Sequence, residues 1–215
     1  MSGPKITTKV CGVCRPQDAR DAVAAGADAI GVILAPSRRQ VTLEEAEAIF
    51  TEVSPGVARV GVFVDADPAF IEEAATRLGL DYVQFHGSET PELCATASTP
   101  VIKAFKVGRT FQAADVDPYR RVVAYALLDT LVEGADGGSG LTFDWGAVGP
   151  LPAGVPVIAA GGLDPGNVAS AIAALHPAAV DVSSGVEVRL REKDPDKLRA
   201  FCEAVRAANH KETIP

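Results

Sequence analysis

The feature that most constrains the fold of this chain is a repeated alternation of short β-branched runs with alanine-rich segments. Several of the runs are almost wholly apolar, as is typical of parallel strands that are covered on both faces. Eight such runs predict strands, at residues 5–12, 29–34, 57–64, 82–86, 101–105, 122–129, 155–160 and 179–183.

The segments between these runs carry helix signals. Thr42 and Glu45 have the spacing of a capping box, Pro68 follows Asp67 at another helix start, and Gly79 would end that helix. Helices are predicted at residues 18–25, 43–50, 69–78, 89–97, 110–116, 143–148, 165–175 and 194–208. Eight strands that alternate with about eight helices predict one α/β domain over residues 1–215, a single (β/α)₈ TIM barrel. An open doubly wound sheet also alternates strands with helices. Such a fold would carry a G-x-G-x-x-G pattern after its first strand, and that pattern is absent here.

Composition narrows the possible partners. The formal net charge of −8 argues against nucleic acid, because binding to nucleic acid depends on basic patches. No run of about 18 apolar residues is present, so no membrane span is predicted. The first residues lack the pattern of a secretory signal, and we therefore expect a cytoplasmic protein with reduced cysteines.

Glycine and serine follow the last two predicted strands, as Gly161-Gly162 and as Ser183-Ser184-Gly185. In (β/α)₈ barrels the functional residues lie at the C-terminal ends of the strands, and phosphate often binds after strands seven and eight. Glycine lets backbone N–H groups approach an anion closely. Tight turns would also explain these glycines, but two clusters on neighbouring strands favour a phosphate-binding site.

An acid and a base are candidates at two other strand ends. Asp129 ends the sixth predicted strand, where a partly desolvated carboxyl suits a general acid. Cys11 ends the first strand, on another side of the barrel mouth. Taken alone, Cys11 could be inert packing and Asp129 could cap a turn. Cys11 and Cys14 also form a C-x-x-C, but the three histidines lack metal-ligand spacing, so a metal or redox site is disfavoured.

Several motifs occur in the order in which one known family carries them. They are Lys9-Val10-Cys11-Gly12 followed by Arg15-Pro16-Gln17-Asp18-Ala19, AGADAIGVILAPSRRQVT (25–42), VQFHGSE (83–89), LLDT (127–130), GGSGLTFDW (137–145), PVIAAGGLDPGNV (156–168), VDVSSGVE (180–187) and KDPDKLRAFCEAVR (193–206). In these blocks, which span nearly the whole chain, the sequence resembles the phosphoribosylanthranilate isomerases of tryptophan biosynthesis. Two departures are Cys14, where the motif usually has threonine, and residues 188–192, where the family commonly has small residues.

The resemblance implies an isomerase that converts N-(5-phosphoribosyl)anthranilate into 1-(2-carboxyphenylamino)-1-deoxyribulose 5-phosphate by an Amadori rearrangement. It implies that Asp129 is the general acid and Cys11 the general base, with no metal or other cofactor. Arg39 would bind the anthranilate carboxylate, and His86 would either contact the substrate or pack the core. Asp181 would either hold substrate hydroxyls or orient its neighbours.

Two other functions compete with this one. Another phosphosugar-barrel isomerase would carry an aspartate where this chain has Cys11. A catalytically silent barrel that binds a phosphometabolite would not need both Cys11 and Asp129, and both are present. The expected partner is a small-molecule phosphoribosyl substrate, and the protein is expected to be a monomer or a homodimer.

Overall fold

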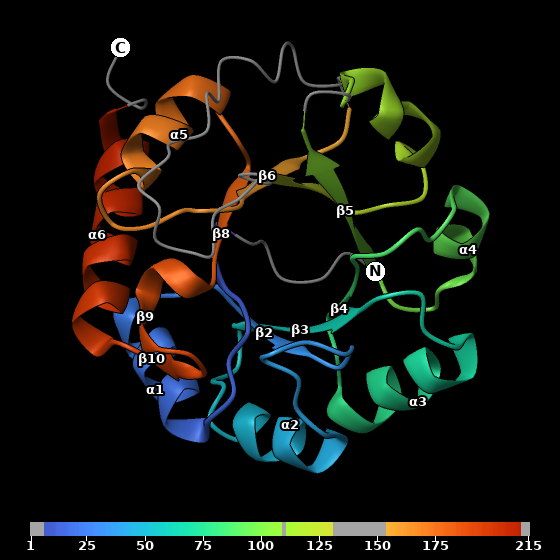
Figure 1. Cartoon of the computed structure of the whole chain (residues 1–215), viewed down its shortest axis with the longest axis horizontal. Coiled ribbons are helices and arrows are strands. Elements are labelled where there is room, and N and C mark those ends of the chain that lie inside the picture. Colours follow the sequence, from blue (N-terminus) through green and yellow to red (C-terminus); the bar gives the residue numbers. More distant parts are fainter. Residues whose placement is uncertain (1–6, 109–110, 131–153, 212–215) are drawn as a thin grey trace.

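Eight parallel strands close into a barrel, in the computed structural model that describes residues 7–108, 111–130 and 154–211. The strands pair in chain order, and β8 pairs with β1 to complete the ring. Helices surround the ring on the outside (Figure 1). The predicted (β/α)₈ barrel is confirmed. The strands are β1 Thr8–Val10, β2 Ala29–Ile33, β3 Ala58–Phe63, β4 Tyr82–Phe85, β5 Val101–Val107, β6 Tyr125–Thr130, β7 Val157–Ala160 and β8 Ala179–Val182.

The helices of the outer ring begin and end where local signals place them. Thr42 and Glu45 form the reciprocal capping box before α2, with N···O distances of 3.2 and 2.8 Å. Gly26 and Gly79 end α1 and α3 in the left-handed conformation. The helices are α1 Pro16–Ala25, α2 Leu43–Phe50, α3 Pro68–Leu78, α4 Pro91–Thr96, a 3-10 helix Ala113–Tyr119, α5 Val168–Leu175 and α6 Pro195–Lys211.

Some predicted boundaries differ from those of the structure. The helix expected at 165–175 starts at Val168, because the Asp164 carboxylate accepts the backbone N–H groups of Gly166 and Asn167 and forms a turn there. The strand expected at 122–129 starts at Tyr125, since residues 122 and 123 donate to the Tyr119 carbonyl that ends the 3-10 helix. The helix expected at 143–148 lies outside the described residues.

A short hairpin after β8 is not predicted by the sequence. A 3-10 turn, Ser184–Val186, leads into β9 Glu187–Arg189, which pairs antiparallel with β10 Glu192–Lys193. These strands are short and lack the apolar alternation that marks a strand in a sequence. The hairpin contains the residues 188–192 in which the chain departs from the family motif.

The buried apolar side chains form three clusters, of which the smallest consists of Val116, Ala126 and Val155. Apolar side chains from several strands fill the interior of the barrel, and a larger cluster lies between the strands and the outer helices. This packing leaves the C-terminal ends of the strands free to form a site. Within the described ranges, none of the helices combines the length and the apolar character that crossing a membrane requires.

Candidate active site

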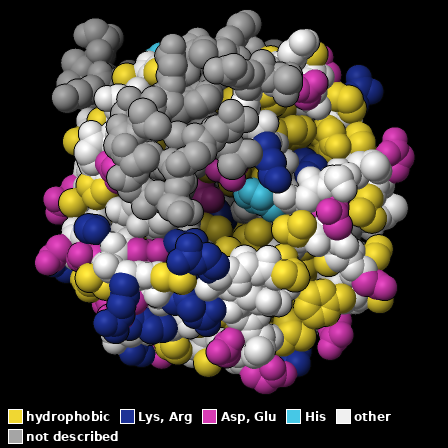
Figure 2. Space-filling model, in the orientation of Figure 1, with side chains coloured by type: hydrophobic (Ala, Val, Ile, Leu, Met, Phe, Trp, Pro, Cys, Tyr) yellow, Lys and Arg dark blue, Asp and Glu magenta, His cyan; other side chains and the backbone are white. Residues whose placement is uncertain are grey.

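A cavity of about 320 Å³ opens at the C-terminal ends of the strands. Figure 2 shows the hollow in the middle of this face, with Lys and Arg side chains beside it. Its wall contains most of the residues that the sequence predicted for a site: Cys11, His86, Asp129, Gly161, Gly162, Asp181, Ser183 and Ser184. Two predicted residues, Arg39 and Gly185, lie outside the lining. The barrel thus brings eight predicted side chains or backbone groups from five strand ends to one cavity.

Asp129, at the end of β6, contacts His86, which follows β4. The His86 Nε2 atom lies 3.1 Å from Asp129 Oδ2, and the Gln84 amide nitrogen lies 3.0 Å from His86 Nδ1. One tautomer satisfies both contacts, because the Gln84 amide donates to Nδ1 while Nε2–H donates to Asp129 Oδ2. About a quarter of each of the His86 and Asp129 side chains is exposed, at 25% and 29%. His86 therefore orients Asp129 in a cavity that a small molecule can reach.

Cys11 follows β1 and is nearly enclosed, with 7% of its surface exposed. Its backbone N–H continues the barrel ladder by donating to the Val182 carbonyl at 2.8 Å. Burial raises the pKa of the Cys11 thiol above its ordinary value, and the positive charge of Lys9 opposes that rise. The thiol thus lies in the cavity wall, next to a cation.

That cation is a residue that sequence reasoning missed as part of the site. Lys9 is fully buried on β1, and its Nζ donates to Asp181 Oδ1 on β8 at 3.0 Å. Lys9 and Asp181 are also paired in the register of the two strands. The signal was present in the sequence, because Lys9 lies inside a predicted strand, and a lysine that is buried there requires a charged partner. Burial raises the pKa of Asp181, and the ion pair with Lys9 opposes that rise.

The two glycine-rich loops lie in contact with each other. Gly161 and Gly162 have φ values of 89° and 63°, which side-chain-bearing residues rarely adopt. A Cβ added at Gly185 would lie 1.9 Å from the Leu163 carbonyl oxygen, so only glycine fits this approach of the β8 loop to the β7 loop. These glycines therefore do more than turn the chain, because they let two backbone segments meet beside the cavity.

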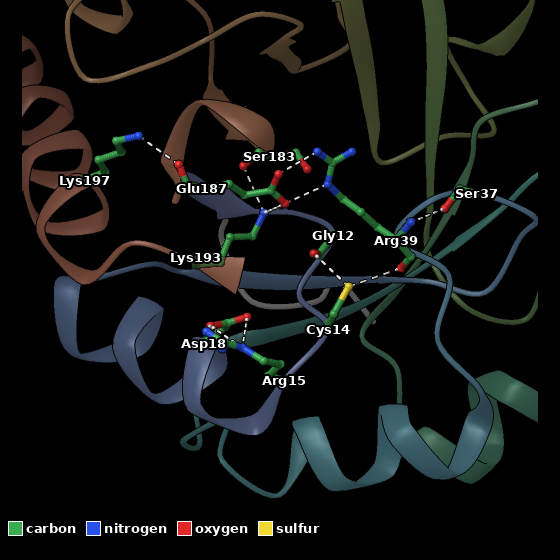
Figure 3. A network of polar contacts seen from close by, with 10 residues as sticks. All are labelled: Gly12, Cys14, Arg15, Asp18, Ser37, Arg39, Ser183, Glu187, Lys193 and Lys197. Carbon is green, nitrogen blue, oxygen red and sulfur yellow. Dashed lines mark hydrogen bonds and ion pairs between the residues drawn. The ribbon is translucent and has the colours of Figure 1, made fainter. Parts of the chain in front are cut away.

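Arg39, after β2, is held by a carboxylate of the protein (Figure 3). Its Nε and Nη2 atoms donate to the two carboxylate oxygens of Glu187 at 2.7 and 2.6 Å. Lys193 lies 3.3 Å from the same carboxylate and donates to the Ser183 carbonyl at 2.9 Å. Burial would raise the pKa of Glu187, but Arg39 and Lys193 outweigh it and hold this pKa below its ordinary value. Glu187 and Lys193 belong to the unpredicted hairpin, which thus fixes the arginine.

Cys14, the second cysteine of the C-x-x-C, contacts backbone carbonyls of two different loops. Cys14 Sγ lies 3.5 Å from the Gly12 carbonyl and 3.4 Å from the Arg39 carbonyl (Figure 3). It thereby links the loops after β1 and β2. In the parts of the chain that the structure describes, no three or more His, Cys, Asp or Glu side chains are grouped as metal ligands would be.

Fold and cavity together define a class: (β/α)₈ barrels whose mouth carries acid–base side chains and glycine-rich loops after the last two strands. The family model for N-(5'-phosphoribosyl)anthranilate (PRA) isomerase matches residues 8–204. The chain belongs to this isomerase family.

Individual relatives agree with this assignment. The chain is 47% identical over 204 residues to N-(5'-phosphoribosyl)anthranilate isomerase of Desulforudis audaxviator, an alignment that covers 93% of this chain and 98% of the relative. The crystal structure of phosphoribosyl anthranilate isomerase from Thermotoga maritima superposes with a TM-score of 0.85 at 39% identity, covering 94% and 99% of the two chains. Another such isomerase, in complex with reduced 1-(o-carboxyphenylamino)-1-deoxyribulose 5-phosphate, gives a TM-score of 0.80 at 36% identity, with the same coverage.

Proposed function

We propose that this protein is a phosphoribosylanthranilate isomerase, which converts N-(5-phosphoribosyl)anthranilate into 1-(2-carboxyphenylamino)-1-deoxyribulose 5-phosphate in tryptophan biosynthesis. One observation carries the proposal. A chain that matches this family over residues 8–204 has a carboxyl, Asp129, and a thiol, Cys11, in the wall of one cavity. We further propose that residues 1–215 form one catalytic domain.

The proposed reaction needs only proton transfers. Protonated Asp129 donates to the ribose ring oxygen, the bond from that oxygen to C1′ breaks, and the nitrogen lone pair forms a Schiff base. The thiolate of Cys11 then removes the proton from C2′, and the electron pair moves to make an enolamine. Tautomerisation of the enolamine yields the ketone. His86 supports this assignment through its contact with Asp129.

The substrate's two anionic ends would bind at different places. Gly161, Gly162 and the segment Ser183-Ser184-Gly185 would supply backbone N–H groups for the phosphate. Arg39 uses one edge of its guanidinium for Glu187, which leaves the Nη1 side without a hydrogen bond to any described residue. A planar guanidinium can bind a second carboxylate through that remaining edge. Asp181 would act here through its ion pair rather than as a free ligand.

A direct assay tests the proposed function. Freshly made phosphoribosylanthranilate is mixed with the protein in EDTA, without added nicotinamide or flavin, and the anthranilate-type fluorescence is followed. We expect the fluorescence to fall at a rate proportional to protein concentration, since no step requires a metal or redox partner. Absence of turnover under these conditions, with recovery on addition of zinc, would point to a metal-dependent activity instead.

Replacement of Arg39 by alanine is expected to weaken binding of the anthranilate end of the substrate more than binding of its phosphate end. Loss of a charge-assisted bidentate contact costs roughly 1.5–3 kcal/mol, or about ten- to a hundredfold in affinity for anthranilate-type carboxylate ligands. Competition by inorganic phosphate should change much less, because the proposed phosphate contacts are backbone N–H groups of the glycine-rich loops and not the Arg39 side chain. Inhibition constants for both ligands measure the effect, and Arg38→Ala, at an exposed neighbour, is the matched control. An equal loss for both ligands would mean that the two subsites are wrongly placed.

A further inference from the structure

A buried ammonium, that of Lys9, lies beside two residues of the cavity wall, Cys11 and Asp181. Lys9 has no solvent exposure, and its Nζ is held by Asp181 Oδ1 at 3.0 Å. Burying a charge is expensive unless it is paired, and an apolar residue would fill the same place without that cost. Because the barrel could be packed without this ion pair, the pair calls for a reason beyond stability.

Lys9 and Cys11 project to the same side of their strand. Side chains two residues apart on a strand share a face, and the neighbouring strand β2 has a glycine, Gly31, beside both of them. A Cβ added at Gly31 would lie 3.1 Å from Cys11 Sγ and 3.2 Å from Lys9 Nζ. The Cys11 sulfur and the Lys9 ammonium therefore both lie next to Gly31, in the space that its missing side chain leaves open.

Charged side chains on several elements influence the ionisation of the Cys11 thiol. Asp181 on β8 disfavours the thiolate, whereas Lys9 on β1 and Lys193 on β10 favour it. Arg39 after β2 contributes a further positive charge, and Asp129 and His86 line the same cavity from β6 and β4. Lys9 is the largest of the favourable charges on the thiol, through its charge and a hydrogen bond. Burial would lower the pKa of Lys9, but the negative charges of Asp181 and of the Cys11 thiolate outweigh that effect and raise this pKa above its ordinary value.

We propose that Lys9 is a positioning residue of this site: its ammonium, held by Asp181, stabilises the thiolate of Cys11 and so enables the thiol to act as a base. The inference rests on the proposed function. In the step concerned, the thiolate accepts the C2′ proton and the C–H electron pair becomes the C1′–C2′ double bond. Lys9 gives up no proton and only stabilises the anion before the transfer. Asp181 in turn holds Lys9 in place. Its role is therefore to orient Lys9 and not to bind the substrate.

The pH dependence of Cys11 alkylation tests this proposal without any substrate. Iodoacetamide is applied to wild-type protein, Lys9→Met and Lys9→Arg over a range of pH, and the Cys11 peptide is quantified by mass spectrometry. An opposite charge within about 4–6 Å moves a pKa by roughly 1–3 units, so Lys9→Met should shift the alkylation midpoint upward by at least about one unit. Lys9→Arg retains the charge and should keep the midpoint close to that of the wild type. The alkaline limit of kcat/KM should move in the same direction.

A second pair of variants covers the case in which Lys9→Met, with Asp181 left unpaired, fails to fold. Asp181→Asn and Lys9→Met/Asp181→Asn differ only in the Lys9 charge, and the double variant should have the higher midpoint. The proposal would be overturned if the alkylation midpoint of Lys9→Met equalled that of the wild type. It would also be overturned if the midpoint of the double variant equalled that of Asp181→Asn. Either result would count even if activity fell. Absence of isomerase activity in the wild type would count against the proposed function, whereas the alkylation midpoints would still decide the role of Lys9.

Discussion

Replacement of Asp129 by asparagine is expected to lower kcat/KM for phosphoribosylanthranilate by about 10²–10⁴-fold, the usual contribution of a positioned general acid. Asparagine preserves the shape of the side chain and can still contact His86, which lies 3.1 Å from the carboxylate. It has no acidic proton to give to the ribose ring oxygen. Because both groups are polar and a quarter exposed, we expect the fold to survive. The fluorescence assay gives the rate, and circular dichroism verifies the fold.

The matched control is Asp117→Asn, which makes the same chemical change at an exposed site paired only with Arg120 within the described ranges. This variant should keep the wild-type rate. If Asp129→Asn also turned over at the wild-type rate, the acid would have to be another group and the proposed mechanism would be wrong.

Replacement of Cys11 by alanine is expected to have an effect of similar size, about 10²–10⁴-fold on kcat/KM, because the base that removes the C2′ proton is lost. In the wild type, burial raises the pKa of this thiol. The active form is the thiolate, so its fraction, and with it kcat/KM, should grow as the pH rises toward that pKa. The alanine variant should lose this rise on the alkaline side. A pH profile of kcat/KM for both proteins measures the difference.

Cys94→Ala is the control for this substitution, since Cys94 is also a buried free cysteine but lies on α4, outside the cavity lining. We expect a small loss of stability from the removed sulfur and an unchanged pH profile. A Cys11→Ala protein that retained the wild-type rate and profile would assign the thiol to packing, which is the alternative that the sequence alone left open.

The sequence by itself determined the barrel and the positions at which its site would lie. The capping box of Thr42 and Glu45 and the glycines that end α1 and α3 are signals carried by a few neighbouring residues. Apolar runs of strand length are equally local, and their regular alternation with helices leaves few ways to pack. Because function in such a barrel lies at the C-terminal strand ends, eight of the ten predicted site residues were found in the cavity wall.

Only the tertiary structure decided which of these residues contact one another. His86 lies 43 residues from Asp129 in the chain, Arg39 lies 148 from Glu187, and Lys9 lies 172 from Asp181. The last pair exists because β8 closes onto β1, and the Arg39 contact depends on a hairpin too short to leave a periodic pattern. Local patterns report the preference of a segment for helix or strand, whereas a charge pair depends on ring closure and register. The partners of Arg39 and of Lys9 therefore became known only from the folded barrel.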